Sequence, residues 1–158
     1  MPNKPLQVVS CLIFDENGRM LLLKRHAEDL GGGLWAAPGG TIEQDETPDK
    51  TLIREVKEET GLVVSSAEYL GSHELQMPHG TAHIRTFQAK VTSSVAITID
   101  PFEHESYGWF ELVNLLNLES IIWGLPTTLL DFGFMSPFQR DPTLADGSKA
   151  ILLEIATE

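Results

Sequence analysis

Residues 47–61 carry the strongest constraint on the fold, because they combine a helix start signal with a helix stop signal. Thr47 is a residue type that caps helix N-termini, and Pro48 suits the first helical position because its φ angle is already helical. Gly61 stands where a left-handed residue commonly ends a helix. The spacing therefore predicts a helix that begins at Pro48 and ends just before Gly61.

This predicted helix has two different faces. At 3.6 residues per turn, Glu55, Glu58 and Glu59 are related by i, i+3 and i+4 and lie within an arc of about 100°. The adjoining arc is apolar and consists of Leu52, Ile53 and Val56. We therefore expect the apolar face to pack on a core. The three acidic side chains repel one another, and a divalent cation such as Mg²⁺ would compensate their charge.

The segments before and after this helix are strand-like runs separated by turn signals. Two apolar runs, Leu6–Phe14 and Met20–Lys24, flank an Asn17-Gly18 pair, which predicts a β-hairpin. The glycine-rich residues 31–40 predict a loop whose backbone can approach a neighbouring group closely. Further strands are expected at Val63–Leu70, Ala82–Val91 and Tyr107–Phe110, and helical segments at Glu111–Leu118 and Pro126–Phe132. Ile151–Ile155 is either a last strand or a docked tail. This order predicts a mixed α/β sandwich.

The length and the net charge of the chain limit its possible functions. A chain of 158 residues is the size of one domain, and it carries 23 acidic against 11 basic side chains, a formal net charge of -12. Such a charge disfavours binding to nucleic acid polymers and to acidic lipid surfaces. The single cysteine, Cys11, excludes an internal disulfide, and no apolar run approaches the length of a membrane helix. We expect a cytoplasmic protein that binds neither membranes nor nucleic acid polymers.

One stretch of the chain matches a known family signature. Gly40 is followed after five residues by Glu46, and after seven more by Arg54-Glu55-Val56-Lys57-Glu58-Glu59-Thr60-Gly61-Leu62. This spacing reproduces every fixed position of the pattern GX5EX7REUXEEXGU, in which U is apolar. The chain therefore resembles the Nudix hydrolases, over roughly Val8–Leu118. The resemblance implies an α/β (α+β) fold, a Nudix-type α/β/α sandwich with a central mixed β-sheet.

The resemblance also implies a set of metal ligands. By similarity, Glu55, Glu58 and Glu59 hold Mg²⁺, with Mn²⁺ as an alternative, and the carbonyl of Gly39 adds a backbone oxygen. Glu46 and Arg54 hold one another and orient the ligand carboxylates. Metal ions in such a site neutralise phosphate oxygens and lower the pKa of an attacking water.

A carboxylate is needed as general base, and the sequence leaves three candidates open. Glu103 lies six residues before Trp109, at the place where some family members carry an additional Glu, and we rank it first. Glu105 lies close by, and Glu55 is the third candidate. Among cations, Arg25 sits where similar proteins place a phosphate-contacting arginine. Together with Gly40, it is our candidate for the substrate-binding region.

The activity implied is cleavage of a diphosphate linkage in a nucleoside diphosphate derivative. A nucleoside triphosphate is the first choice of substrate, and ADP-ribose or another nucleotide sugar is the alternative. A Nudix-like module that senses a nucleotide without hydrolysing it is the competitor from another class, but such modules commonly lose signature carboxylates. We expect residues 1–135 to form the domain, residues 136–158 to be a tail packed on it, and the protein to be a monomer or homodimer.

Overall fold

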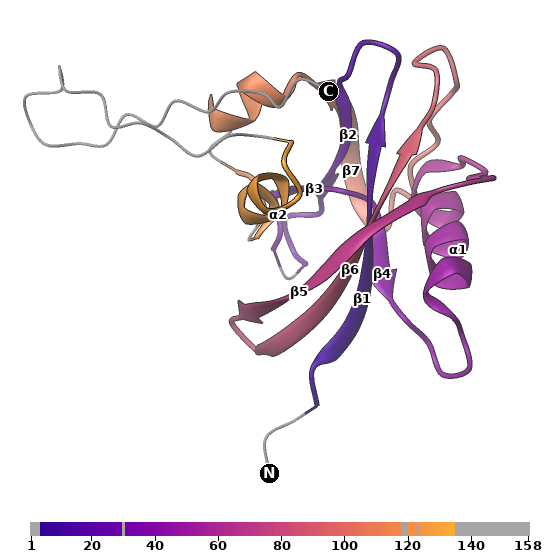
Figure 1. Ribbon diagram of the computed structural model, residues 1–158. Helices are drawn as coiled ribbons and strands as arrows, with labels where there is room; N and C mark the ends of the chain where they lie inside the picture. The colour runs from indigo at the N-terminus through magenta and orange to yellow at the C-terminus, as the bar shows by residue number, and fades with distance from the viewer. Residues whose placement is uncertain (1–3, 30, 118–119, 123, 135–158) are drawn as a thin grey trace, which may run out of the picture.

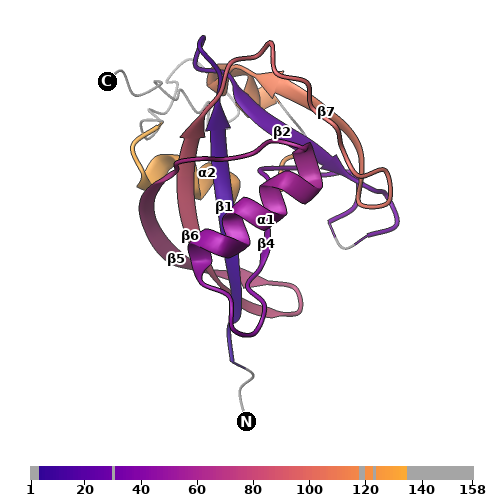
Figure 2. The same ribbon diagram turned by 90° about the vertical axis from the view of Figure 1, so that its right-hand side faces the viewer.

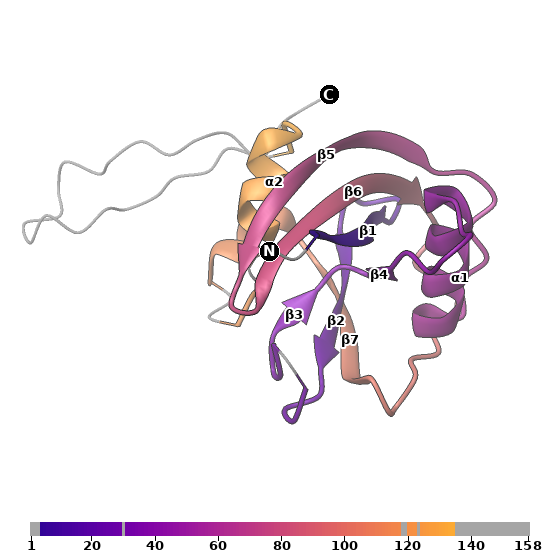
Figure 3. The same ribbon diagram turned by 90° about the horizontal axis from the view of Figure 1, so that it is seen from below.

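The computed structural model describes residues 4–29, 31–117, 120–122 and 124–134, and shows a mixed β-sheet between two helices. Helix α1 spans Pro48–Thr60 and helix α2 spans Leu125–Asp131. Figures 1 and 3 show the two helices on opposite sides of the sheet. The expected α/β/α layering is therefore confirmed. No helix among the described residues is long and apolar enough to cross a bilayer.

The sheet contains seven strands within these described ranges. They are β1 (Leu6–Phe14), β2 (Met20–Arg25), β3 (Trp35–Ala36), β4 (Gly39–Thr41), β5 (Glu68–Met77), β6 (Gly80–Lys90) and β7 (His104–Phe110). The order is β3-β2-β1-β6-β5, with β4 also paired to β1 and β7 to β2. Strands β1 and β6 are parallel and the other pairs are antiparallel, so the sheet is mixed as predicted.

Both faces of the sheet are buried at Cys11–Phe14 of β1 and at Met20–Leu23 of β2, which explains why these stretches are continuous apolar runs. Cys11 and Ile13 belong to the core cluster on the α1 side, whereas Leu12 and Phe14 belong to the cluster on the α2 side. Strand β2 alternates in the same way, with Leu21 and Leu23 against Met20 and Leu22. The centre of the sheet is thereby held rigidly between the two helices.

Helix α1 has the predicted ends. Pro48 is its first residue, the Thr47 side chain accepts a hydrogen bond from the backbone N–H of Lys50, and Gly61 is left-handed with φ 77°. Figure 2 shows α1 lying across the sheet in front of β1. Val56 is fully buried against the sheet, but Ile53 is 44% exposed. The buried stripe of this helix is therefore narrower than predicted.

The predicted β-hairpin is confirmed, but its two strands pair only next to the turn. The Asp15 carboxylate accepts hydrogen bonds from the backbone N–H groups of Asn17 and Arg19, and Gly18 has φ 76°. Strands β1 and β2 are in register only at Phe14 and Met20. From there they diverge, because β1 pairs along its length with β6, and β2 pairs with β7.

Other boundaries differ from the sequence predictions. The strand predicted over Val63–Leu70 begins instead at Glu68 and continues to Met77, since Val63 is 74% exposed and residues 63–67 form a loop. The glycine-rich residues 31–40 contain the short strands β3 and β4. The first of the two late helical segments is a 3₁₀ helix, Leu112–Asn117, and the second is α2. Ile151–Ile155 and the predicted tail lie outside the described residues.

Candidate active site

Strand β4 brings the backbone against the acidic face of α1. A Cβ atom on Gly40 would overlap the carboxylate of Glu55, so only glycine leaves room for this carboxylate beside the strand. The backbone N–H of Gly39 donates a hydrogen bond of 2.9 Å to Oε1 of Glu59. A Cβ atom on Gly39 would overlap the carbonyl of Val9 on the paired strand β1. The two glycines therefore allow helix, strand and carboxylates to approach closely.

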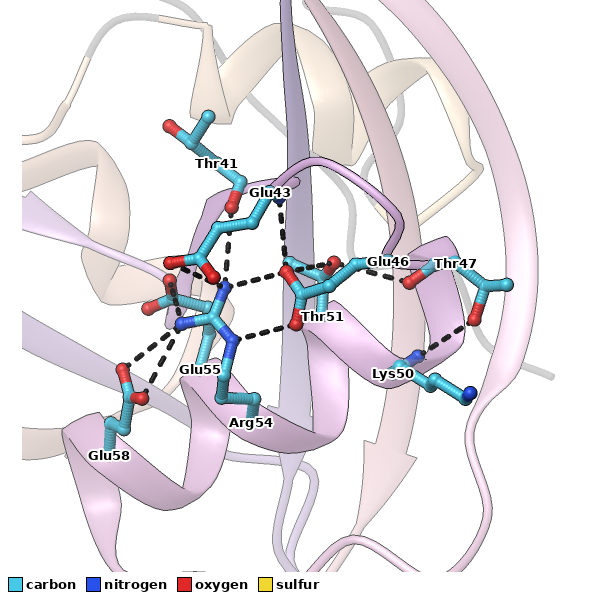
Figure 4. A network of polar contacts seen from close by, with 9 residues as sticks. All are labelled: Thr41, Glu43, Glu46, Thr47, Lys50, Thr51, Arg54, Glu55 and Glu58. Carbon is cyan, nitrogen blue, oxygen red and sulfur yellow. Dashed lines mark hydrogen bonds and ion pairs between the residues drawn. The ribbon is translucent and has the colours of Figure 1, made fainter.

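Arg54 is the centre of a polar network that joins the loop before α1 to the acidic face (Figure 4). Its Nε and Nη2 atoms donate to the two oxygens of Glu46, at 2.8 and 2.9 Å. Its Nη1 atom donates to Glu55 at 3.0 Å and lies 3.3 Å from Oε2 of Glu58. Thr51 adds a hydrogen bond from its hydroxyl to Glu46. One guanidinium thus contacts three signature carboxylates.

Hydrogen bonds fix the charge of Glu46. The pKa of Glu46 is lowered to about 2, first by the hydrogen bond from Arg54 and then by the backbone N–H of Glu43. The side chain of Glu46 is 17% exposed and that of Arg54 is 26% exposed. A bidentate arginine–carboxylate pair of this kind has a fixed geometry. The pair therefore forms a rigid support for the neighbouring carboxylates.

The three acidic residues on the signature face of α1 have different environments. Glu59 is buried, 5% exposed, and burial raises its pKa to about 8. Glu55 is half-buried, and burial raises its pKa as well. The side chain of Glu58 is 55% exposed. The negative charge of Glu103 raises the pKa of both Glu55 and Glu59, so Glu103 faces the same site.

Glu103 lies in the loop that precedes β7. The backbone N–H of Glu103 donates to Asp100, and its carbonyl accepts from the N–H of His26. Its carboxylate, that of Glu59 and the imidazole of His104 offer ligand atoms that all lie within 4.8 Å of one another. The structure thus brings the predicted loop residue Glu103 next to the predicted helix residue Glu59.

His104 lies in this site but was not among the residues predicted from the sequence. It is 3% exposed, and its Nε2 atom lies 3.4 Å from Oε2 of Glu59. Burial lowers its pKa to about 4, so the imidazole is neutral near pH 7. The sequence signal that could have identified it is the order Glu103-His104-Glu105 just before a predicted strand, since strand alternation turns His104 and Glu105 to opposite faces.

Glu105, the second candidate base, has another partner. Its carboxylate lies 3.1 Å from the Nζ atom of Lys24 on the neighbouring strand β2. The alternation of side chains along a strand directs Glu105 to the face opposite that of His104. This ion pair distinguishes Glu105 from Glu103.

A cavity of about 300 Å³ opens beside these residues. Its polar end includes Arg25, Gly39, Gly40, Glu59 and His104. Its other end is lined mainly by apolar side chains of β1, β5, β6 and α2, namely Val8, Leu75, Met77, Ala82, Ile84 and Leu125. The cavity can therefore take a molecule with a charged part and a less polar part.

The donor atoms at the polar end fit a hard divalent cation. Carboxylate oxygens are the ligands that Mg²⁺ and Mn²⁺ prefer, and Glu55, Glu59 and Glu103 are clustered closely enough to influence one another's charge. Like charges this close together, with Glu59 buried, are costly unless a cation neutralises them. Such a site can bind metal ions together with phosphate groups.

Comparison with known proteins identifies the family. Residues 4–129 match the family model described as the NUDIX domain. The chain belongs to the Nudix family. Among its relatives, the CTP pyrophosphohydrolase of Escherichia coli strain K12 is 30% identical over 106 residues, which are 67% of this chain and 76% of that protein.

Solved structures agree with this assignment. The crystal structure of a MutT protein from Methanosarcina mazei Go1 has a TM-score of 0.75 at 27% identity, and the match covers 84% of this chain and 96% of that chain. The NUDIX domain of NrtR from Shewanella oneidensis, crystallised with ADP-ribose, has a TM-score of 0.70 at 22% identity, over 80% and 85% of the two chains. The second match shows a shared fold.

The Nudix resemblance inferred from the signature is therefore confirmed, as are the fold class and the reaction class. This Nudix protein is a hydrolase of phosphoric anhydride bonds, and Nudix hydrolases generally use a divalent metal. The roles of individual site residues and the division of the chain at residue 135 stay predictions.

Proposed function

We propose that this Nudix hydrolase is a Mg²⁺-dependent pyrophosphohydrolase of a nucleoside triphosphate. The observation that carries the proposal is the cavity of about 300 Å³ that extends from Glu59 of α1 to apolar side chains of β5, β6 and α2. The pyrophosphohydrolase activity named for the Escherichia coli relative, which acts on CTP, supports the same substrate class.

The residues of the site divide into three roles in this proposal. Glu55, Glu58 and Glu59, with the carbonyl of Gly39, hold the cation. A cation held by these residues would supply neutralisation of the phosphate oxygens and a lowered pKa for the attacking water. Arg25 lines the cavity beside Glu59, which supports a role in contacting the phosphates.

Glu103 is the proposed general base. Its carboxylate belongs to the same cluster as that of Glu59, whereas the carboxylate of Glu105 pairs with Lys24. As a base, Glu103 would accept the proton that the attacking water loses as its oxygen attacks phosphorus. Glu55 is engaged by Arg54, which favours its role as a ligand over a role as base.

The test is a product assay over a panel of nucleoside triphosphates, ADP-ribose and other nucleotide sugars, each with and without Mg²⁺. We expect metal-dependent turnover of a triphosphate, and loss of about 100-fold or more in turnover for Glu58→Gln and Glu103→Gln. Glu105→Gln is the matched control and should retain turnover within a few-fold of wild type. Absence of turnover on the whole panel, or an unaffected Glu58→Gln, would contradict the proposal.

A further inference from the structure

His104 is a buried imidazole in a site whose other titratable groups are mainly carboxylates. It is the first residue of β7, where it pairs with Arg25 of β2, and its backbone N–H donates to the carbonyl of Asp100 at 2.9 Å. The side chain is 4% exposed. Because strand pairing fixes the backbone and burial restricts the rotamer, the ring is held in place toward Glu59.

Within the part of the chain that the structure describes, one ring nitrogen of His104 lacks a hydrogen bond, and the other makes only a long contact with Glu59. Among the described residues, Nδ1 has no hydrogen-bond partner. Nε2 lies 3.4 Å from Oε2 of Glu59, beyond the 2.7–3.2 Å that is usual for an N–H···O hydrogen bond. An ion bound by both Nε2 and Oε2 of Glu59 would replace this long contact with two metal–ligand bonds.

The separation of these atoms suits two ligands of one ion. With metal–ligand bonds of about 2.1 Å, adjacent ligand atoms are about 3.0 to 3.4 Å apart, and opposite ones about 4.2 Å. The atoms offered by Glu59, Glu103 and His104 all lie within 4.8 Å of one another. Small side-chain adjustments would therefore place His104 and Glu59 on a single cation, with the carboxylate of Glu103 close enough to act on a water beside it.

We propose that His104 donates a nitrogen ligand to a divalent ion that it shares with Glu59. The inference rests on the proposed metal-dependent function and adds a selectivity to it. Imidazole nitrogen is a softer donor than carboxylate oxygen, and it raises the affinity for transition metals relative to Mg²⁺. The site thus takes Mn²⁺ or Co²⁺ more tightly than a site made only of carboxylates.

Pulsed electron paramagnetic resonance of the Mn²⁺-loaded protein tests this directly, because a nitrogen bound to Mn²⁺ modulates the electron spin echo. We expect this modulation in wild type and its loss in His104→Gln. His79→Gln is the matched control, since His79 is exposed in the turn between β5 and β6, and it should keep the modulation. Absence of the modulation in wild type, or its survival in His104→Gln, overturns the proposal.

Metal competition provides a second measurement. The ratio of Co²⁺ to Mg²⁺ affinity should fall by about tenfold or more in His104→Gln and stay unchanged in His79→Gln. An equal loss of affinity for both ions would mean that His104 only positions Glu59, and would overturn the ligand role. The wild-type echo measurement does not depend on whether a variant folds.

The two proposals fail in different ways. An enzyme that hydrolyses a nucleotide with Mg²⁺ but shows no nitrogen modulation with Mn²⁺ refutes the His104 ligand and leaves the proposed function standing. A protein that shows the modulation but turns over no diphosphate compound refutes the proposed function and leaves the metal ligand standing.

Discussion

The guanidinium of Arg54 donates two hydrogen bonds to the carboxylate of Glu46, one from Nε at 2.8 Å and one from Nη2 at 2.9 Å. The remaining nitrogen, Nη1, reaches Glu55, which is the next residue, and Glu58, which lies one turn farther along the same helix. Glu46 precedes the helix, so this pair ties the entry of α1 to the carboxylates farther along it. The geometry of the acidic face therefore depends on the planar guanidinium group of Arg54.

Replacing Arg54 by lysine should remove this support while keeping the positive charge. An ammonium group cannot make the two parallel hydrogen bonds and still reach Glu55. We expect Arg54→Lys to lower turnover by about 10- to 100-fold in a nucleotide hydrolysis assay. Arg19→Lys is the matched control, because Arg19 pairs with Asp15 in the turn between β1 and β2. Equal activities of the two variants would contradict this role of Arg54.

The same pair predicts how stability responds to acid. The folded-state pKa of Glu46 is about 2, below its ordinary value of 4.5. Its contribution to stability is therefore fully present above pH 4.5, and is lost as pH falls from 4.5 to about 2. In Glu46→Gln this contribution is absent at every pH, so the free energy of unfolding should fall less steeply over that window. Urea unfolding at several pH values measures both slopes.

Glu43→Gln serves as the control for the acid response. The Glu43 carboxylate is 68% exposed and lies 3.8 Å from Arg54. Its replacement should leave the slope of the wild-type protein nearly unchanged. A Glu46→Gln variant as acid-sensitive as wild type would show that the Arg54 pair does not stabilise the folded state.

A substitution at Gly40 should affect activity much more than it affects stability. A Cβ atom at this position would overlap the end of the Glu55 side chain, which is flexible and can rotate away. We therefore expect Gly40→Ala to change the melting temperature by only a few degrees, while metal affinity and turnover fall by about tenfold or more. For Gly18→Ala we expect the opposite, a loss of stability without a loss of activity. The added Cβ atom would contact no other atom among the described residues, but a φ of 76° costs an alanine about 1 kcal/mol.

The sequence correctly predicted those features of the fold that depend on interactions between neighbouring residues. The ends of α1 follow from Thr47, Pro48 and Gly61, and the turn after β1 follows from Asn17-Gly18, because each of these residues acts on its own backbone. The spacing of the glutamates likewise placed them on one helix face. These features required no knowledge of which strands pair.

The features that the sequence did not predict depend on pairing between strands that are distant in the sequence. The apolar Val63 and Val64 suggested a strand, but the register between β5 and β6 begins at Glu68 and places residues 63–67 in a loop. His104 entered the site because β7 pairs with β2 and turns alternate residues inward. The apolar end of the cavity likewise combines strands and a helix that are distant in the sequence.

Cys11 should be chemically inert in the folded protein. It is fully buried in β1, and burial raises the pKa of its thiol to about 12, so almost no reactive thiolate exists at pH 8. We expect no reaction with a thiol-specific disulfide reagent under native conditions, and one thiol per chain in urea. Rapid labelling of the native protein would show that β1 is accessible and would contradict the buried centre of the sheet.

Metal removal should abolish nucleotide binding. The chain has a net charge of -12, and the polar end of the cavity contains Glu59 together with one described arginine, Arg25. A triphosphate entering this end without a cation meets like charges in a partly buried environment, where they are poorly screened. Calorimetric titration should therefore show binding with Mg²⁺ and a loss of affinity of about 100-fold or more in excess EDTA. Binding of equal strength without metal would mean that the nucleotide is held elsewhere, and Arg25→Gln would then leave the affinity unchanged.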